Sequence, residues 1–281
     1  MRDETFMTLV RLLPRALLSR AVGAATRAPA PASLHRVAMR RFSRVYRVQL
    51  DEAERPLETY RTFSEFFSRG LKAGARPVDA GDRVVVSPVD GAVSEAGLIE
   101  RGECVQAKGV VYPVAELLGD SEAAQSFAEG GSFVTLYLSP RDYHRVHAPL
   151  GGSITGWRYL PGELWPVNPA SVRSVPGLFA LNERLVTWLD TPAGQCAVVM
   201  VGATCVGRIR AAYDDVLAQS GRPPAARSFA PPLSLAKGDE LGRFEMGSTV
   251  ILLFASGRVT WDATLRPGAQ VTTGRRIGEA R

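Results

Sequence analysis

Two patterns of hydrophobic and polar positions divide the chain. Up to about residue 72, apolar residues recur at helical spacing with arginines between them. From residue 83 onward, short apolar runs are separated by Gly, Pro and Asp, which is typical of strands and turns. We therefore predict an α+β fold, with an N-terminal amphipathic helical region over residues 1–72 and a predominantly β domain over residues 73–281.

The helical region is predicted to hold two longer amphipathic helices and a short one. In the first, Pro14 should kink or divide an apolar series made of Phe6, Leu9, Val10, Leu13 and Leu17. After an Ala-Pro-rich connector, the second helix has an apolar face made of Leu34, Val37, Ala38, Phe42 and Val45. Thr62 and Glu65 match a capping box, which predicts a short helix over residues 63–68.

Positive charge is concentrated in the same region. The net charge is +6, yet ten arginines stand against two acidic residues before Leu50, so the remaining chain is close to neutral. Basic amphipathic helices can lie in the interface of an anionic bilayer, or they can pack on a protein core with their arginines in solvent. We expect no nucleic acid partner, because no basic strand carries interleaved aromatic residues. No apolar stretch has membrane-spanning length.

A Gly-Ser pair stands at the entrance of the most apolar strand of the β domain. Residues 250–254 predict a buried strand, and Gly247 and Ser248 precede it. Glycine leaves its carbonyl sterically open, so the Ser248 hydroxyl could attack that carbonyl if a base lay nearby. Taken alone, these residues favour a simple turn before a core strand.

Two of the three histidines, His144 and His147, lie together in a Pro-bounded turn directly after a predicted strand. Such a pair can bind a metal or serve as two acid–base groups. We expect no metal, because no Glu or Cys stands at a spacing that would complete a site. Structural histidines bonded to backbone are the alternative, and the concentration of a scarce residue favours acid–base chemistry.

The third candidate is Asp90, which precedes Gly91 after another short strand. An Asp-Gly pair there is an ordinary turn signal. The carboxylate could instead orient an imidazole, and Asp90, His147 and Ser248 would then form an acid–base–nucleophile set. The sequence does not show that these residues meet in space.

Three motifs together resemble one family of enzymes. They are Ser-Pro-Val-Asp-Gly at 87–91, Tyr-Leu-Ser-Pro-Arg-Asp-Tyr-His-Arg-Val-His at 137–147 and Met-Gly-Ser-Thr at 246–249. Their pattern is similar to that of phosphatidylserine decarboxylases of the bacterial, membrane-associated type. The agreement continues at residues 106–109, 182–184, 201–204 and 242–244, so the resemblance covers essentially the whole chain.

The resemblance implies that the chain processes itself. It would be cut between Gly247 and Ser248 into a large subunit (1–247) and a small subunit (248–281), with His147 as the base and Asp90 orienting it. Ser248 would become a pyruvoyl group, which forms a Schiff base with phosphatidylserine and accepts electrons as CO2 leaves. His144 would return a proton to the α-carbon, giving phosphatidylethanolamine.

The resemblance also implies a peripheral enzyme on the cytoplasmic face of the bacterial inner membrane, bound to anionic lipid through its arginine-rich helices. A homodimer of the processed unit is a further expectation. We interpret residues 157–179 as an apolar loop beside the acyl chains or the membrane, with packing on the core as the alternative. Substrate contacts are expected from Tyr137, Leu164 and Trp165.

Two other classes of function remain consistent with the residues. A serine hydrolase using Asp90, His147 and Ser248 would keep its chain intact. A non-catalytic, membrane-bound β module would tolerate the loss of both histidines. Cleavage of the chain distinguishes the decarboxylase from both.

Overall fold

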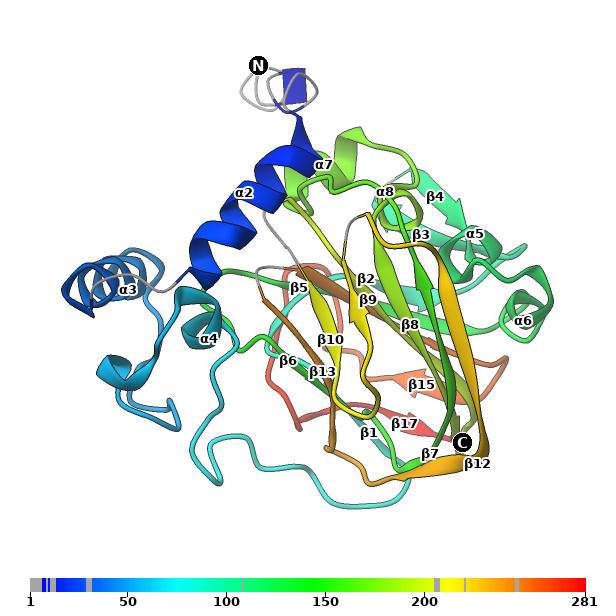
Figure 1. The fold of residues 1–281 in the computed structure, drawn as a ribbon. Helices are drawn as coiled ribbons and strands as arrows, with labels where there is room; N and C mark the ends of the chain where they lie inside the picture. Colours follow the sequence, from blue (N-terminus) through cyan, green and yellow to red (C-terminus); the bar gives the residue numbers. More distant parts are fainter. Residues whose placement is uncertain are drawn as a thin grey trace.

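A mostly β body carries a small helical part at its N-terminal side, which confirms the predicted α+β fold (Figure 1). The computed structural model describes residues 7–8, 10, 14–28, 32–107, 109–204, 208–219, 221–245 and 248–281. For Ser248, the description covers the backbone and not the side chain.

An eight-stranded antiparallel sheet is the main element of the body. Its order is β12-β7-β8-β9-β14-β5-β2-β16. In that order the strands are β12 (Ala225–Leu235), β7 (Gly152–Leu160), β8 (Arg184–Thr191), β9 (Gly194–Val201), β14 (Ser248–Phe254), β5 (Ser132–Leu138), β2 (Gly91–Leu98) and β16 (Gln270–Val271). Strand β14 therefore lies near the middle of the sheet, between β9 and β5 (Figure 1).

Strand β14 confirms the buried strand predicted at residues 250–254. Val250 pairs with Leu136 on one side and with Met200 on the other. The side chains from Val250 to Phe254 are all fully buried. Both faces of the sheet are covered here, which explains why the sequence shows a continuous apolar run and not an alternating one.

Two smaller sheets and a hairpin complete the body. The four-stranded sheet has the order β11 (Leu217–Ala218), β10 (Ile209–Ala211), β13 (Glu240–Phe244) and β6 (Arg145–His147). The three-stranded sheet has the order β1 (Val84–Val86), β17 (Arg276–Ala280) and β15 (Val259–Trp261). The hairpin pairs β3 (Glu103–Ala107) with β4 (Val110–Pro113).

Four short helices pack on the body. They are α5 (Val114–Leu118), α6 (Ser121–Gln125), α7 (Pro169–Ser174) and α8 (Leu178–Leu181). Asp120 begins α6 by accepting hydrogen bonds from the backbone N–H groups of Glu122 and Ala123.

The stretch 157–179 is not the apolar loop that we predicted. Its first residues belong to β7 and pair with β8 and β12, and α7 lies within it. Several of its apolar side chains are buried in the core: Tyr159, Leu164, Leu178 and Phe179. The alternative that we left open, packing on the core, is confirmed. The loop interpretation was wrong because prolines and glycines signal turns locally, whereas the pairing of β7 depends on strands distant in sequence.

The helical part contains α2 (Arg15–Arg27), α3 (Ala32–Tyr46), the 3-10 helix η1 (Leu57–Thr59) and α4 (Phe63–Phe67). Pro14 directly precedes α2, and the described residues before it are helical, so Pro14 divides the series as predicted. Thr62 Oγ1 accepts a hydrogen bond from the Glu65 backbone N–H, which confirms the cap of the short helix. The Glu65 carboxylate accepts from the Arg61 backbone N–H.

Helix α3 packs through Met39, which was not part of its predicted apolar face, and through Phe42, which was. Met39 is buried and Phe42 is half-buried on a small second core, whose other members are Val48, Leu57, Tyr60, Phe63 and Phe66. The other residues of the predicted face are exposed: Ala38 and three larger side chains, Leu34, Val37 and Val45, which are 61–65% exposed and which we call the α3 stripe. Packing on the core therefore does not account for these three residues.

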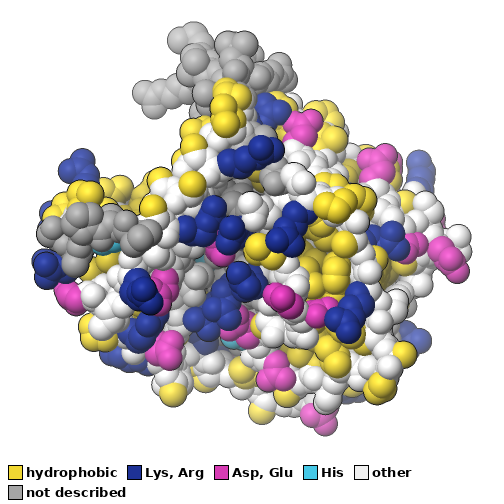
Figure 2. All heavy atoms as spheres, in the orientation of Figure 1, with side chains coloured by type: hydrophobic (Ala, Val, Ile, Leu, Met, Phe, Trp, Pro, Cys, Tyr) yellow, Lys and Arg dark blue, Asp and Glu magenta, His cyan; other side chains and the backbone are white. Residues whose placement is uncertain are grey.

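Ion pairs connect the helical part to the body. Arg15 lies 2.6 Å from Glu163, and Arg27 lies 3.4 Å from Glu245. Figure 2 shows Lys and Arg side chains gathered on the face where α2 and α4 adjoin the strands β6, β10 and β13, with acidic side chains among them. The two parts are thus joined by charged contacts as well as by packing.

Candidate active site

One end of the eight-stranded sheet brings the predicted site residues together. Ser248 opens β14 opposite Leu138, the last residue of β5. The histidine turn follows β5 directly, and Asp90 precedes β2 beside the same end of β5. Adjacent strands lie about 4.8 Å apart, so the backbones of Asp90 and Ser248 are roughly 10 Å apart, two strands away from each other.

Of the two residues at the predicted cleavage position, the structure describes only the one that follows the scissile bond, Ser248. The Ser248 backbone is fixed by its pairing in β14, whereas Gly247 lies outside the described residues. The cut itself therefore stays a prediction.

His144 is completely buried in the turn after β5. Its ring packs against Phe67 at a tilt of 45° with the centroids 4.1 Å apart, and its Nδ1 lies 2.8 Å from the carbonyl oxygen of Asp142. A carbonyl only accepts, so Nδ1 carries the proton and Nε2 carries a lone pair. Within the described chain, that Nε2 has no hydrogen-bond partner. Burial lowers the pKa of His144 to about 3, so the ring is neutral at pH 7.

His147 has partners at both ring nitrogens. Its Nδ1 lies 2.8 Å from the Gly238 carbonyl oxygen, and its Nε2 lies 3.0 Å from the Tyr143 hydroxyl. The carbonyl again places the proton on Nδ1, so Nε2 accepts from Tyr143. Burial lowers the pKa of His147. Its backbone N–H donates to the carbonyl oxygen of Pro88, which ties the histidine turn to the Asp90 turn.

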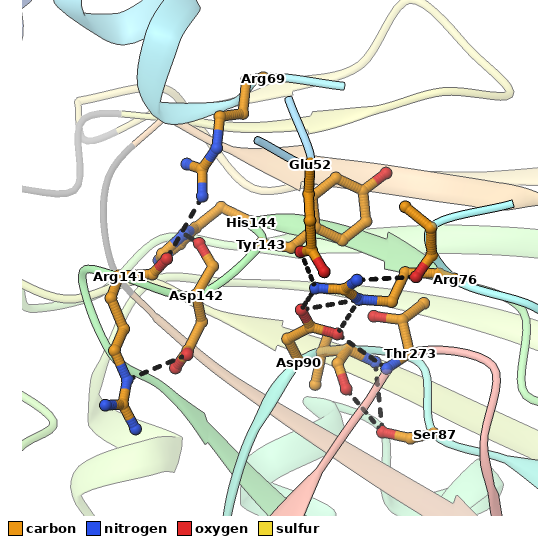
Figure 3. A network of polar contacts seen from close by, with 12 residues as sticks. Glu52, Arg69, Arg76, Ser87, Asp90, Arg141, Asp142, Tyr143, His144 and Thr273 are labelled. Carbon is orange, nitrogen blue, oxygen red and sulfur yellow. Dashed lines mark hydrogen bonds and ion pairs between the residues drawn. The ribbon is translucent and has the colours of Figure 1, made fainter. Parts of the chain in front are cut away.

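Asp90 is held by an arginine and not by a histidine (Figure 3). Its carboxylate accepts hydrogen bonds from Arg76 Nε at 2.9 Å, from Arg76 Nη2 at 2.6 Å and from the Thr273 backbone N–H at 2.8 Å. Arg76 also donates to Glu52 at 2.9 Å. A Cβ on Gly91 would collide with the backbone of β5, so glycine lets β2 begin this close to it.

The structure thus brings Asp90 and His147 to adjoining turns without a hydrogen bond between them. Both nitrogens of His147 have other partners, and the oxygens of Asp90 face Arg76 and Thr273. The charge of Asp90 still reaches the imidazole, because it raises the pKa of His147 against the larger effect of burial. The relay of Asp90, His147 and Ser248 stays a prediction.

Two cavities adjoin this end of the sheet. A polar cavity of about 330 Å³ is lined by residues of the helical part, including Glu52 and Arg69, and by Asp90 and Tyr143 of the body. A second cavity, of about 370 Å³, is lined mainly by apolar residues and by Tyr137. Tyr137 pairs with Thr249, next to Ser248. The second cavity therefore lies close to the start of β14.

Of the other predicted substrate contacts, Leu164 is buried and Trp165 is half-buried. The Arg15 guanidinium lies 3.6 Å from the centre of the Trp165 ring. Substrate contact by these two residues stays a prediction. In the part of the chain that the structure describes, no three His, Cys, Asp or Glu side chains are grouped so that they could hold a metal ion.

Comparison with known proteins decides the family. A family model described as phosphatidylserine decarboxylase matches residues 63–279. The chain is 60% identical over 278 residues to a phosphatidylserine decarboxylase proenzyme of Myxococcus xanthus (strain DK1622), covering 99% of both chains. The chain belongs to the phosphatidylserine decarboxylase family.

Other relatives in the phosphatidylserine decarboxylase family are similar over their full length. A proenzyme of Anaeromyxobacter sp. (strain K) is 57% identical, with 100% of each chain covered. A proenzyme of Azotobacter vinelandii (strain DJ / ATCC BAA-1303) is 44% identical, covering 100% of this chain and 99% of its own. The helical part is therefore included in the similarity to these members of the family.

In this phosphatidylserine decarboxylase family member, a buried acid that we did not predict as a site residue lies at the same end of the sheet as Ser248. Glu183 is fully buried, its Oε2 accepts from the Tyr159 hydroxyl at 3.1 Å, and burial raises its pKa to about 7. Its carbonyl accepts from the Gly202 backbone N–H, one residue beyond the end of β9, so it lies at the same end of the sheet. No periodicity or spacing marks such a residue, because its burial depends on β7 and β9.

Proposed function

We propose that this chain is a self-processing, pyruvoyl-dependent phosphatidylserine decarboxylase that produces phosphatidylethanolamine. The observation that carries the proposal is a buried, neutral histidine, His144, at the end of the sheet where Ser248 opens β14, with an Nε2 that no described residue bonds. Family membership over the whole chain supports the same assignment.

Self-cleavage would use the residues of the two adjoining turns. In this proposal His147 Nε2 accepts the proton of Ser248 as its Oγ attacks the Gly247 carbonyl, and the charge of Asp90 stabilises the imidazolium. The acyl shift gives an ester, and β-elimination then releases the Gly247 carboxylate and leaves dehydroalanine. Hydrolysis of dehydroalanine consumes water, releases ammonia and leaves the pyruvoyl group. Tyr143, which now donates to Nε2, must yield its place to Ser248.

Decarboxylation would place His144 beside the reacting carbon. The pyruvoyl group supplies a ketone for the substrate amine and a carbonyl that accepts electrons as CO2 leaves. The free Nε2 of His144 suits a residue that takes up a proton and delivers it to the α-carbon. The contact with Phe67 restricts the orientation of the ring, and the Asp142 carbonyl fixes its tautomer.

We also propose a peripheral position on the cytoplasmic face of the inner membrane. The exposed α3 stripe and the arginines of the helical part support it, since apolar and basic groups together favour an anionic interface. None of the described helices has the length and apolar character needed to cross a bilayer. The two subunits would stay together, and pairing of processed units into a homodimer is part of the same proposal.

Intact-mass analysis of the purified protein tests the proposed processing. We expect two pieces, of 247 and 34 residues, the smaller with a pyruvoyl group at its N-terminus, and release of CO2 from phosphatidylserine. Ser248→Ala should stay uncut and inactive. An uncut wild-type chain would contradict the proposal, and labelling of that chain by a serine-directed phosphonate would favour a serine hydrolase.

The role of His144 is tested separately from cleavage. His144→Ala should still be cut but should lose decarboxylation, because the proton carrier is gone while Asp90 and His147 remain. His147→Ala is the matched variant and should leave most of the chain uncut. A cleaved and active His144→Ala enzyme would refute the assigned role.

A further inference from the structure

Arg69 is a buried cation whose charge and hydrogen-bond donors have few partners among the described residues. It follows α4 and is 4% exposed. Its Nη2 donates a hydrogen bond of 3.3 Å to the carbonyl oxygen of Arg141, while its Nε and Nη1 are buried without a partner among the described residues. A buried guanidinium with unused donors is costly to maintain, so the position requires an explanation.

The acidic residues near Arg69 are already engaged. Asp90 accepts from Arg76 and from the Thr273 backbone, and Asp142 accepts from the backbone N–H and hydroxyl of Ser139. The guanidinium carbon lies 5.5 Å from the centre of the Phe66 ring, which gives modest stabilisation. Burial lowers the pKa of Arg69 more than these neighbours raise it. The described chain therefore supplies no anion of its own for this side chain.

Arg69 lines the polar cavity of about 330 Å³, together with Arg47 and Arg141. Figure 3 shows Arg69 pointing from the helical part toward the turn that carries Asp142 and His144. Phe67, two residues before Arg69, packs against His144, and Tyr143 lines the cavity, so the cavity adjoins the histidine that we assign to proton delivery. Space, buried positive charge and unused donors thus coincide beside the reacting groups.

We propose that Arg69 binds the phosphodiester of the substrate headgroup in this cavity, with Arg47 and Arg141 adding positive potential at its wall. The inference rests on the proposed function. Guanidinium matches phosphate oxygens through parallel N–H donors. Two carbons and an oxygen separate the amine of the serine headgroup from its phosphorus, so a phosphodiester at Arg69 keeps the amine in or beside this cavity, at the end of the sheet that carries Asp90 and Tyr143.

The phosphodiester suits Arg69 better than the substrate carboxylate does. The carboxylate loses its charge as CO2 leaves, so an ion pair with it would stabilise the ground state more than the transition state and would slow the reaction. The phosphodiester keeps its charge throughout. Arg69 should therefore bind that group equally in the ground state and in the transition state. Loss of this binding should raise KM and leave kcat unchanged.

The test uses the processed enzyme and dihexanoyl phosphatidylserine, a soluble substrate that separates headgroup binding from membrane binding. Arg69→Gln should raise KM roughly 10- to 100-fold, as expected for lost hydrogen bonds to a charged group, with kcat changed less than about threefold. Arg69→Lys, which keeps the charge without the planar donors, should show a smaller rise. Arg101→Gln, at an exposed position in the turn before β3, is the control and should match the wild type.

The product distinguishes the two anionic groups. Dihexanoyl phosphatidylethanolamine has the phosphodiester and no carboxylate, so its inhibition constant should rise in Arg69→Gln by the same factor as KM. An unchanged inhibition constant, or a loss confined to kcat, would overturn the assignment. If Arg69→Gln does not fold, Arg69→Lys carries the same comparison. A wild-type enzyme that is uncut or inactive would instead contradict the proposed function, so the two failures are distinguishable.

Discussion

His144 and His147 are close in sequence, yet their surroundings leave them with different chemistry. Each ring donates from Nδ1 to a backbone carbonyl, so each has its lone pair on Nε2. In His147 that lone pair accepts from Tyr143, whereas in His144 it has no partner among the described residues. At the scale of the residue, the tautomers and the partners decide which imidazole is free to act.

Burial of His144 predicts a dependence of stability on pH. The pKa of His144 falls from 6.5 in the unfolded chain to about 3 in the fold. Between these two pH values the unfolded state binds more protons than the folded state. The contribution of His144 to the free energy of unfolding is therefore complete above about pH 6.5 and is lost as the pH falls toward 3. From pH 7 to pH 5, this group should lower the free energy of unfolding by on the order of 2 kcal/mol.

Denaturant titrations of the wild type and of His144→Asn check this prediction. The variant should lose less stability between pH 7 and pH 5, and the two proteins should show equal slopes between pH 7 and pH 8.5. Equal slopes in the acidic range would contradict the prediction.

The largely buried ion pair of Arg76 with Asp90 predicts a second effect at the residue scale, a loss of stability when the pair is broken. Arg76→Gln leaves Asp90 nearly buried without its counter-ion, so the variant should lose on the order of 3 kcal/mol of unfolding free energy. Adding Asp90→Asn should recover part of that loss. Arg275→Gln breaks a more exposed pair with Asp79 and should cost less than about 1 kcal/mol. Equal losses in Arg76→Gln and Arg275→Gln would refute the role of burial.

At the element scale, helix α3 has apolar residues at helical spacing on two sides, one packed on the protein and the other exposed. Met39 and Phe42 face the small second core, while the α3 stripe stays exposed. Helical periodicity predicted an apolar face, but it did not predict which of these residues the fold would cover. The part left open is the part available to a membrane.

The α3 stripe predicts binding to anionic vesicles. Leu34→Gln with Val45→Gln should weaken that binding about 10-fold or more, since two apolar side chains would no longer leave water. Activity on dihexanoyl phosphatidylserine should stay within about twofold. Sedimentation with vesicles measures the binding, and high salt should weaken it in the wild type.

Exposed apolar residues of the body provide the control for the α3 stripe. Leu98→Gln with Val111→Gln changes residues that are 58% and 46% exposed, and it should leave vesicle binding unchanged. Equal weakening by the two double variants would contradict a specific role of the helix.

The segment after Ser248 is interleaved with the rest of the molecule. Strand β14 lies between β5 and β9, β16 pairs with β2, and β17 pairs with β1. A cut before Ser248 would therefore leave the small subunit inside two sheets. At the scale of the whole molecule, backbone hydrogen bonds and buried apolar area should hold the two subunits together.

This interleaving predicts that the processed subunits do not separate without unfolding. Gel filtration should give one peak containing both pieces, at the elution volume of uncut Ser248→Ala. The 34-residue piece should be released only in the range of denaturant where the body unfolds. Release of that piece under native conditions would refute the arrangement.

The sequence by itself determined the apolar run of β14, the cap of α4 and the three motifs that carry the candidate chemistry. These are encoded locally, because apolar periodicity, a capping side chain and a turn dipeptide act within a few residues. Only the tertiary structure decided that Asp90 faces Arg76, that Nε2 of His144 has no hydrogen-bond partner among the described residues, and that Arg69 and Glu183 are buried. Those properties depend on strands and turns distant in sequence, since burial and partners arise only when the sheet brings its ends together.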